Sequence, residues 1–297
     1  MKSACKIVLA VVMLFILTAS AFALPQTAIN IEYSAGKTQF DFYRLADFSE
    51  QSGLSLTDEF SKYTDSIAFL DSLGSLDADK SRMLATTLEA VVLRDGVAPT
   101  YTALSDQNGK LSIGDIQKGV YLVIGQISRD EQFVYTPSPL IVSVPTRDIN
   151  GQLQYSVSII HNKVQKEELS DSPVKYKVIK VWKDSGTQKY RPTTLDVSLF
   201  KDGAHVQTVT LNAANNWSYE WTDLQSGAHW TVVEKKVPEK YTMAVDKEQT
   251  SIFITNTYDT PPPPKLPSTG QLWWPIPPLV IVGAVSILLG LLRTKEV

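Results

Sequence analysis

The sequence predicts a mainly β fold with two β-sandwich domains, the first of which carries helical insertions. Two observations predict this fold. Apolar and polar residues alternate in short runs between turn-forming clusters from Val174 to Tyr258, and similar runs surround a helical pattern in residues 24–164. The 297 residues suit about two domains of roughly 100–200 residues each. A content of 43% hydrophobic and 20% charged residues is ordinary for a globular protein.

The second domain, residues 174–258, shows strand patterns throughout. Side chains alternate over Tyr176–Val181, Leu195–Phe200 and Val206–Leu211. Clusters that contain glycine, aspartate or asparagine separate these runs and predict turns. Short β-rich runs at this spacing indicate a β-sandwich of about 85 residues.

The first domain, residues 24–164, mixes strands with helices. Apolar residues recur at helical spacing from Asp79 to Leu93, and Gly96 ends this pattern, while Thr57 precedes a second, short helix. The polar segment 165–173 ends in proline and predicts a linker between the domains. The strands expected around the helices cover residues 27–33, 39–43, 119–127, 140–144 and 153–160.

A weak internal repeat links the two domains. The segments Asp115-Ile116-Gln117-Lys118-Gly119 and Asp223-Leu224-Gln225-Ser226-Gly227 each precede a strand that begins with an aromatic residue. The shared pattern is short, so duplication and convergence both remain open.

The N-terminal residues 1–23 have the three parts of a secretory signal peptide. A basic start precedes an apolar run from Ile7 to Leu17, and Ala21-Phe22-Ala23 fits a cleavage site. The run is short for a retained anchor, because a bilayer span needs about 20 residues. Cleavage would remove Cys5, the single cysteine of the sequence, so the exported chain could hold no disulfide.

The C-terminal part predicts a spacer followed by a membrane span. Residues 259–265 include four consecutive prolines, which favour an extended, stiff polyproline II stalk. An apolar segment over residues 272–292 is long enough to cross a bilayer, and the basic tail 293–297 would stay inside the cell.

Several function classes find no support in the sequence. A net charge of −3 argues against nucleic-acid binding, which usually needs a basic face. The three histidines lie apart in the sequence, and no nucleophile elbow, paired-histidine metal motif or glycine-rich phosphate loop occurs. We therefore expect no metal, no cofactor and no enzyme activity on an external substrate.

The pentapeptide Leu266, Pro267, Ser268, Thr269 and Gly270 precedes the apolar span and the basic tail. This order of parts resembles the cell-wall sorting signal of Gram-positive surface proteins, which joins an LPxTG motif to an apolar span and a basic tail. The resemblance implies that residues 266–297 are a sorting signal. It also implies that a sortase cuts between Thr269 and Gly270 and transfers Thr269 to an amine, on a peptidoglycan precursor or another subunit. The chain would then cross the membrane only transiently before it is anchored to the wall.

Five segments of the second domain form a recognisable set: Lys180-Val181-Trp182-Lys183-Asp184, Arg191-Pro192-Thr193, Trp217-Ser218-Tyr219, Trp230-Thr231-Val232-Val233-Glu234 and Ile254-Thr255-Asn256-Thr257. With them, the domain resembles the Cna-B repeat of Gram-positive adhesins and pilins, which is an Ig-like β-sandwich. The resemblance implies an isopeptide bond between Lys180 in the first strand and Asn256 in the last, promoted by Glu234. We expect burial among Trp182, Trp230 and Phe253 to lower the pKa of the lysine and raise that of the glutamate.

The first domain contains Phe40-Asp41-Phe42-Tyr43-Arg44-Leu45-Ala46-Asp47 and Gly119-Val120-Tyr121-Leu122-Val123. These segments make it similar to the N-terminal domain of major pilins, but it lacks the crosslinking residues. No lysine occurs between Leu24 and Gly36, and Gly125 stands where the repeat would place a glutamate. We therefore predict no isopeptide bond in this domain.

Pilins of this kind use a lysine near the end of the first domain to join subunits. Lys163 is the candidate here, although the usual Tyr-Pro-Lys-Asn pattern is absent. Lys166, Lys175 and Lys177 are nearby competitors.

The resemblances imply a secreted, wall-anchored subunit of a Gram-positive surface pilus, whose partners are sortases and other pilin subunits. A shaft subunit and a basal or minor subunit both remain open. The alternative is a monomeric wall-anchored adhesin that binds a host or matrix ligand.

Overall fold

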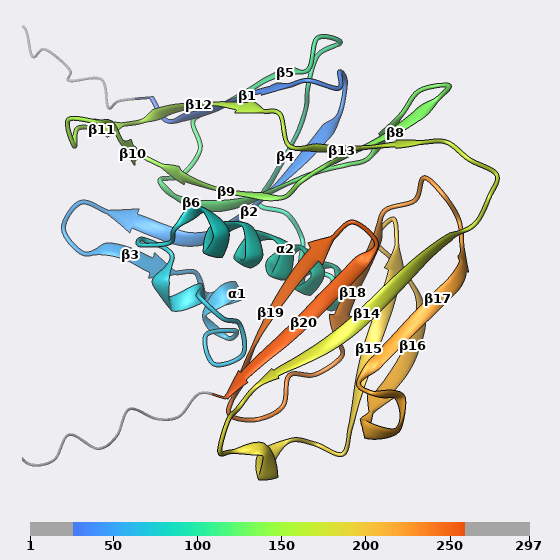
Figure 1. The fold of residues 1–297 in the computed structure, drawn as a ribbon. Helices are drawn as coiled ribbons and strands as arrows, with labels where there is room; N and C mark the ends of the chain where they lie inside the picture. The colour runs from blue at the N-terminus through green and yellow to red at the C-terminus, as the bar shows by residue number, and fades with distance from the viewer. Residues whose placement is uncertain (1–25, 259–297) are drawn as a thin grey trace, which may run out of the picture.

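The computed structural model describes residues 26–258, and these residues form mainly β-strands (Figure 1). The signal peptide, the proline stalk and the sorting signal predicted from the sequence lie outside this range. Within the described range, no helix is both long enough and apolar enough to cross a membrane.

The first part of the chain, to residue 168, holds thirteen strands and the longer helices. The helices are α1 (Asp58–Ser61) and α2 (Ala78–Asp95), with a 3-10 turn η1 (Leu70–Ser72) between them. The strands are β1 (Ala28–Tyr33), β2 (Gln39–Ser49), β3 (Gly53–Leu56), β4 (Tyr101–Leu104), β5 (Lys110–Gly114), β6 (Gly119–Gly125), β7 (Ser128–Arg129), β8 (Phe133–Pro137), β9 (Leu140–Val144), β10 (Thr146–Arg147), β11 (Leu153–Gln154), β12 (Ser156–His161) and β13 (Val164–Glu168).

Two sheets of the first part face each other across an apolar core. One sheet has the order β12-β1-β5, and the other has the order β3-β2-β6-β9, with β4 also paired to β2. Period-two alternation points Ile29, Ile31 and Tyr33 of β1 into this core, where they meet Phe40 and Tyr121 of the facing sheet. The predicted first β-sandwich is therefore present.

The second part is a sandwich of two sheets, with the orders β17-β14-β20-β19 and β16-β15-β18. Two 3-10 turns, η2 (Gln188–Tyr190) and η3 (Ala213–Asn215), lie in its connections. Its strands are β14 (Val174–Lys183), β15 (Thr194–Lys201), β16 (Ala204–Asn212), β17 (Ser218–Leu224), β18 (Trp230–Glu234), β19 (Tyr241–Glu248) and β20 (Ser251–Tyr258).

The helix α2 forms where the sequence predicted it and lies between the two sandwiches (Figure 1). Asp77 caps its first turn by accepting a hydrogen bond from the Lys80 amide at 2.8 Å, and Gly96 ends it in a left-handed conformation with φ of 63°. The apolar side of α2 contacts β6 and β9 of the first part and β18 and β19 of the second. One buried cluster consequently includes residues of both sandwiches.

Polar contacts join α2 to the second sandwich as well. Thr87 Oγ1 accepts a hydrogen bond from the Val245 amide at 2.7 Å, and Arg94 Nη1 donates one to the Glu234 carbonyl oxygen at 3.0 Å. These bonds and the shared core hold the two parts as one packed body.

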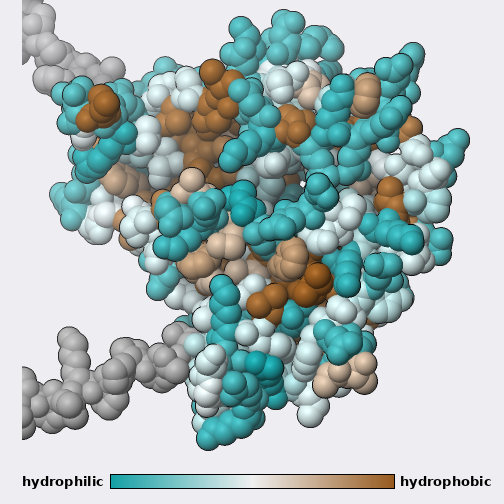
Figure 2. Space-filling view, in the orientation of Figure 1, coloured by the Kyte–Doolittle hydropathy of each residue, from teal (hydrophilic) through white to brown (hydrophobic). Residues whose placement is uncertain are grey.

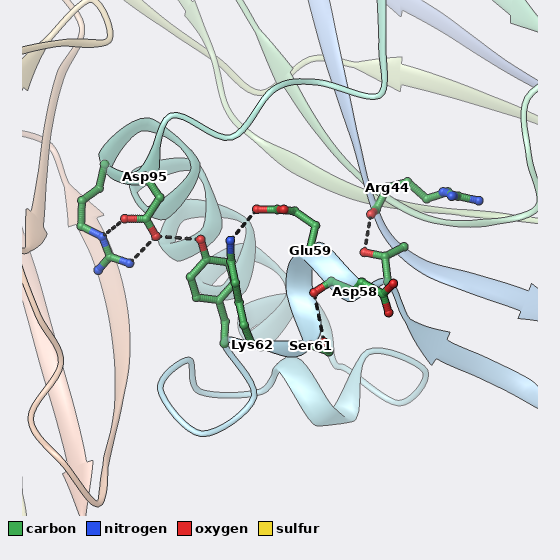
Figure 3. A network of polar contacts seen from close by, with 9 residues as sticks. Arg44, Asp58, Glu59, Ser61, Lys62 and Asp95 are labelled. Atoms are coloured by element: carbon green, nitrogen blue, oxygen red, sulfur yellow. Dashed lines mark hydrogen bonds and ion pairs between the residues drawn. The ribbon is translucent and has the colours of Figure 1, made fainter.

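The C-terminal end of α2 is also tied to the segment around α1 (Figure 3). Asp95 pairs with the neighbouring Arg94 and accepts a hydrogen bond from Tyr63 Oη at 2.7 Å. Lys62, next to this tyrosine, forms an ion pair with Glu59 at 2.7 Å.

Hydrophilic side chains cover most of the face shown in Figure 2, where apolar side chains gather in separate patches.

The linker predicted over residues 165–173 is partly wrong. Residues up to Glu168 continue as β13, which pairs with β8 in register from Val164↔Pro137 to Glu168↔Phe133. The polar composition of β13 suggested a linker rather than a strand. Its pairing with β8 uses backbone groups and needs few apolar side chains. Only residues 169–173 connect the two parts without regular structure.

Aromatic rings fill the end of the first sandwich where β1 and β12 stop. Tyr33 packs edge-on against Phe40, with ring centroids 5.6 Å apart, and the imidazole of His161 lies 5.9 Å from the Tyr33 ring. His161 is buried, and burial lowers the pKa of its imidazole. His161 Nε2 has no hydrogen-bond partner within residues 26–258, so no acceptor there stabilises a second proton.

The shared core predicts that both sandwiches unfold in one transition. Replacing Leu88, which is fully buried on α2, by alanine should lower the free energy of unfolding by about 2–5 kcal/mol because it leaves a cavity. Urea unfolding followed by circular dichroism should show the entire transition shifted. The exposed control Lys62→Ala should change the free energy by less than about 0.5 kcal/mol, and separate transitions for the two parts would contradict the prediction.

The buried imidazole predicts a loss of stability in acid. Below the ordinary histidine pKa of 6.5, the unfolded chain takes up a proton that folded His161 resists, so the free energy of unfolding falls as the pH falls. Urea unfolding on either side of this pH should show a weaker dependence in His161→Asn than in the parent chain. The exposed His205→Asn control should keep the parent's dependence, and equal slopes in all three chains would refute this role of His161.

Candidate functional site

The fold brings together Lys180, Glu234 and Asn256, the three residues that the sequence singled out. Lys180 lies on β14, which runs parallel to β20, and the register pairs Lys180 with Ile254 and Trp182 with Asn256. Glu234 ends β18 in the facing sheet. The three side chains therefore meet between the two sheets of the second sandwich.

Their distances place the glutamate between the amine and the amide. Lys180 Nζ lies 3.3 Å from Glu234 Oε1, and Asn256 Nδ2 donates a hydrogen bond to Glu234 Oε2 at 3.2 Å. The Lys180 amine also donates to the carbonyl oxygens of Val181 at 3.1 Å and Ile254 at 3.0 Å. Each carboxylate oxygen thus faces a different member of the site.

Complete burial sets the electrostatics of this group. The side chains of Lys180 and Glu234 have 0% exposed surface, and Asn256 is also 0% exposed. Burial lowers the pKa of Lys180 to about 8, although the nearby Glu234 carboxylate acts in the opposite direction. Burial raises the pKa of Glu234, an effect that the Lys180 ammonium opposes.

Both directions shift the pair toward a neutral amine beside a neutral carboxylic acid. An unprotonated amine is a nucleophile, and a carboxylic acid can donate a hydrogen bond to a carboxamide and move protons to a leaving group. Strand pairing supplies proximity, which can replace much of the barrier of a reaction between two molecules. The arrangement can therefore support attack of the Lys180 amine on the Asn256 side chain.

The environment of the lysine agrees only in part with the sequence prediction. Trp182 covers the amine, with Lys180 Nζ 4.2 Å from the ring centroid. Phe253 is half-buried and lies on the other face of β20, because the side chains of Ile252, Ile254 and Asn256 alternate with it toward the core. The expected role of Phe253 is therefore wrong.

A second polar group, missed in the sequence, holds the outer side of Trp182. The Asp184 carboxylate is buried, pairs with the Arg191 guanidinium and accepts a hydrogen bond from Tyr241 Oη at 3.0 Å. The Arg191 guanidinium lies 5.5 Å from the Trp182 ring, and the Tyr241 ring packs edge-on against it at 5.3 Å. In the sequence, Asp184 looks like an ordinary turn residue. The one sign of a structural role was its place in the segment Lys180–Asp184, which carries the resemblance to the Cna-B repeat.

The first sandwich repeats the same strand arrangement without the reactive residues. Its β1 runs parallel to β12, and the pair Tyr33↔His161 corresponds in order to Trp182↔Asn256. Ile31 and His161 consequently occupy the places of Lys180 and Asn256. The rings of Tyr33, Phe40 and His161, rather than an amine, a carboxyl group and an amide, occupy this end of the first sandwich.

Gly125 stands on β6 at the place that the sequence assigned to the missing glutamate. A Cβ atom at this glycine would lie 2.6 Å from Pro137 Cγ and 2.8 Å from Phe40 Cε1. Pro137 and Phe40 thus fill the space that a side chain at this position would need, and the absence of a crosslink in this domain stays a prediction.

The candidate acceptor Lys163 is exposed and lies in the two-residue connection between β12 and β13. Its carbonyl oxygen accepts a hydrogen bond from the Ser138 amide at 3.0 Å, which holds the backbone while the side chain is free to extend. The competitor Lys166 packs over Phe133, with 3.6 Å from its amine to the ring centroid. Lys175 and Lys177 are exposed on β14.

Two further expectations concern sites elsewhere in the chain. The sorting motif, residues 266–270, lies outside the described residues. Residues 26–258 contain no group of three or more histidine, cysteine, aspartate or glutamate side chains able to hold a metal ion.

One curated protein and two solved structures illustrate what the chain is similar to. A collagen adhesin of Staphylococcus aureus is 29% identical over 224 residues, which cover 71% of this chain and 17% of that protein. A single B repeat unit of the collagen-binding surface protein Cna of Staphylococcus aureus is 18% identical with a TM-score of 0.29, covering 79% of this chain and 98% of that chain. The minor pilin GBS52 of Streptococcus agalactiae is 13% identical with a TM-score of 0.23, covering 82% of this chain and 99% of that chain.

The chain spans less than a fifth of the length of the curated relative. The family model of the Cna protein B-type domain matches residues 176–257, a range that begins in β14 and ends in β20 and so contains Lys180, Glu234 and Asn256. The second sandwich of this chain is a Cna-B-type domain.

Proposed function

We propose that the chain is a structural subunit of a Gram-positive surface pilus, processed by sortase and stiffened by an internal isopeptide bond. The fully buried Lys180–Glu234–Asn256 group inside a Cna-B-type domain carries this proposal. The sorting signal predicted over residues 266–297 adds covalent attachment through Thr269 to peptidoglycan or to a second subunit.

The bond forms without a cofactor. The unprotonated Lys180 Nζ attacks Cγ of Asn256, the new N–C bond closes, and the C–N bond to Nδ2 breaks. One amine proton passes through the Glu234 carboxyl group to the departing nitrogen, which leaves as ammonia. The chain reacts once on itself, and sortase is the enzyme that acts on the product.

Mass spectrometry of the intact chain tests the bond directly. The parent chain should be lighter than its sequence mass by one ammonia. Lys180→Ala, Asn256→Ala and Glu234→Gln should each restore the full mass, because they remove the nucleophile, the amide or the proton carrier. Loss of the bond should also lower the free energy of unfolding by about 4 kcal/mol or more, if it acts like a disulfide that closes a long loop.

The matched control is Lys183→Ala, which removes an exposed lysine at the end of the same strand. This variant should still lack one ammonia, and a peptide that joins the β14 and β20 segments should appear after digestion. A parent chain with its full sequence mass would rule out the bond.

The acceptor amine for polymerisation is assigned to Lys163. Its exposure and its place after β12 support this assignment, since a sortase-bound partner needs free access to the amine. Lys166 is less suited because its amine rests on the Phe133 ring.

Blots of cell-wall extracts test the assembly. The parent chain should give a ladder of covalent polymers, and Lys163→Ala should collapse the ladder to a wall-bound monomer. Thr269→Ala should release the chain from the wall altogether. An unchanged ladder in Lys163→Ala would show that Lys163 is not the acceptor. The variants Lys166→Ala, Lys175→Ala and Lys177→Ala, tested in parallel, would then identify the acceptor as the lysine whose replacement removes the polymers.

The same blot separates the remaining roles. A shaft subunit appears in every rung, whereas a basal or minor subunit contributes one copy to each polymer. The alternative of a wall-anchored adhesin is supported by the similarity to the collagen adhesin over 71% of this chain, and it gives a single band.

A further inference from the structure

Five aromatic side chains form a row that leads from the buried lysine to the C-terminal end of the second sandwich. We call Trp217, Trp182, Tyr241, Tyr258 and Tyr190 the aromatic row. Successive ring centroids lie 5.1, 5.3, 5.2 and 5.2 Å apart. The first three contacts are edge-to-face, and the last, between Tyr258 and Tyr190, is stacked with an interplanar angle of 14°.

The outer end of the row is exposed and basic. Tyr190 in the turn η2 is 45% exposed although its ring stacks on Tyr258. The amines of Lys189 and Lys240 lie 5.0 and 5.1 Å from the centroid of this ring. Neither lysine forms an ion pair with any residue of the described range, so this end presents an aromatic surface between two free cations.

The chain leaves the structure at this same place. Tyr258 is the last described residue, and the next residues are Asp259, Thr260 and the four prolines 261–264. An extended chain advances about 3.1 Å per residue in polyproline II. Pro261 can therefore reach about 9 Å from Tyr258, which exceeds the 5.2 Å between the stacked rings.

We propose that the proline segment 261–264 of the same chain docks on the outer end of the aromatic row. Proline rings in a polyproline II helix pack against exposed aromatic rings, and this helix loses little entropy on docking because it is already extended. Asp259 supplies the negative charge that complements Lys189 and Lys240.

Docking would give the aromatic row a role besides filling the core. It would fix the direction in which the C-terminal segment leaves the Cna-B-type domain, so the domain and the proline segment 261–264 would behave as one stiff unit. This inference does not depend on sortase processing or on the isopeptide bond, because it concerns only contacts within one chain.

A spin label placed next to the prolines measures the docking. The full chain in detergent carries Cys5→Ser and Lys265→Cys, which leaves one cysteine for the label. Electron paramagnetic resonance should show restricted motion in this parent chain. Tyr190→Ala should shorten the rotational correlation time several-fold, and replacing prolines 261–264 by a glycine–serine segment should do the same.

The matched control is Tyr219→Ala, which removes another exposed tyrosine that packs on Trp221 away from the row. Its spectrum should equal that of the parent. Equal mobility in the parent and in Tyr190→Ala would overturn the proposal, as would an equal change in Tyr219→Ala. Restricted motion that disappears on dilution would show that the prolines of a second copy occupy the row, which also overturns docking within one chain.

Discussion

The burial of a lysine and a glutamate against each other is the constraint on which the second sandwich depends. In their charged forms the two groups attract each other but lose their hydration, and removing one partner of such a buried pair typically costs about 3–5 kcal/mol. An amide bond between Lys180 and Asn256 would remove this conflict, since the lysine nitrogen could then no longer carry a charge. Burial of the lysine would therefore favour both the reaction and its product.

The two sandwiches share a pair of parallel strands, but different side chains fill the space beside this pair in each of them. The second uses a polar triad covered by Trp182, and the first uses the aromatic packing of Tyr33, Phe40 and His161. The helix α2 lies between them and bonds to the backbone of Glu234 through Arg94, so the first sandwich helps to hold the strand that carries the site. The candidate site lies in the second sandwich alone, yet the two halves share one buried cluster.

The sequence was sufficient where local pattern decides the structure. Alternation and turns predicted β14, β15 and β16 of the second sandwich, and apolar spacing with Gly96 predicted α2. The helical pattern did not reveal that α2 packs on both sandwiches, because an apolar face shows that a helix is buried on one side but not which element covers it. The strand β13 was missed because it is defined by pairing with β8, which lies far away in the sequence. The Asp184–Arg191 pair was missed because Asp184 lies in a turn that looks exposed in the sequence.

The positions of the proposed bonds also answer which parts of the chain would carry force. A pull from the wall would enter β20 at Tyr258, pass two residues to Asn256 and cross through the proposed bond to Lys180 in the parallel strand β14. From Lys180 it would follow β14 back to Val174, run through β13 and, with Lys163 as acceptor, leave the chain before reaching β12. The strands between Lys180 and Asn256 would then lie outside the line of force, and so would β1 to β12 of the first part. With these two attachment points, most of the first part would bear no load even without a crosslink of its own.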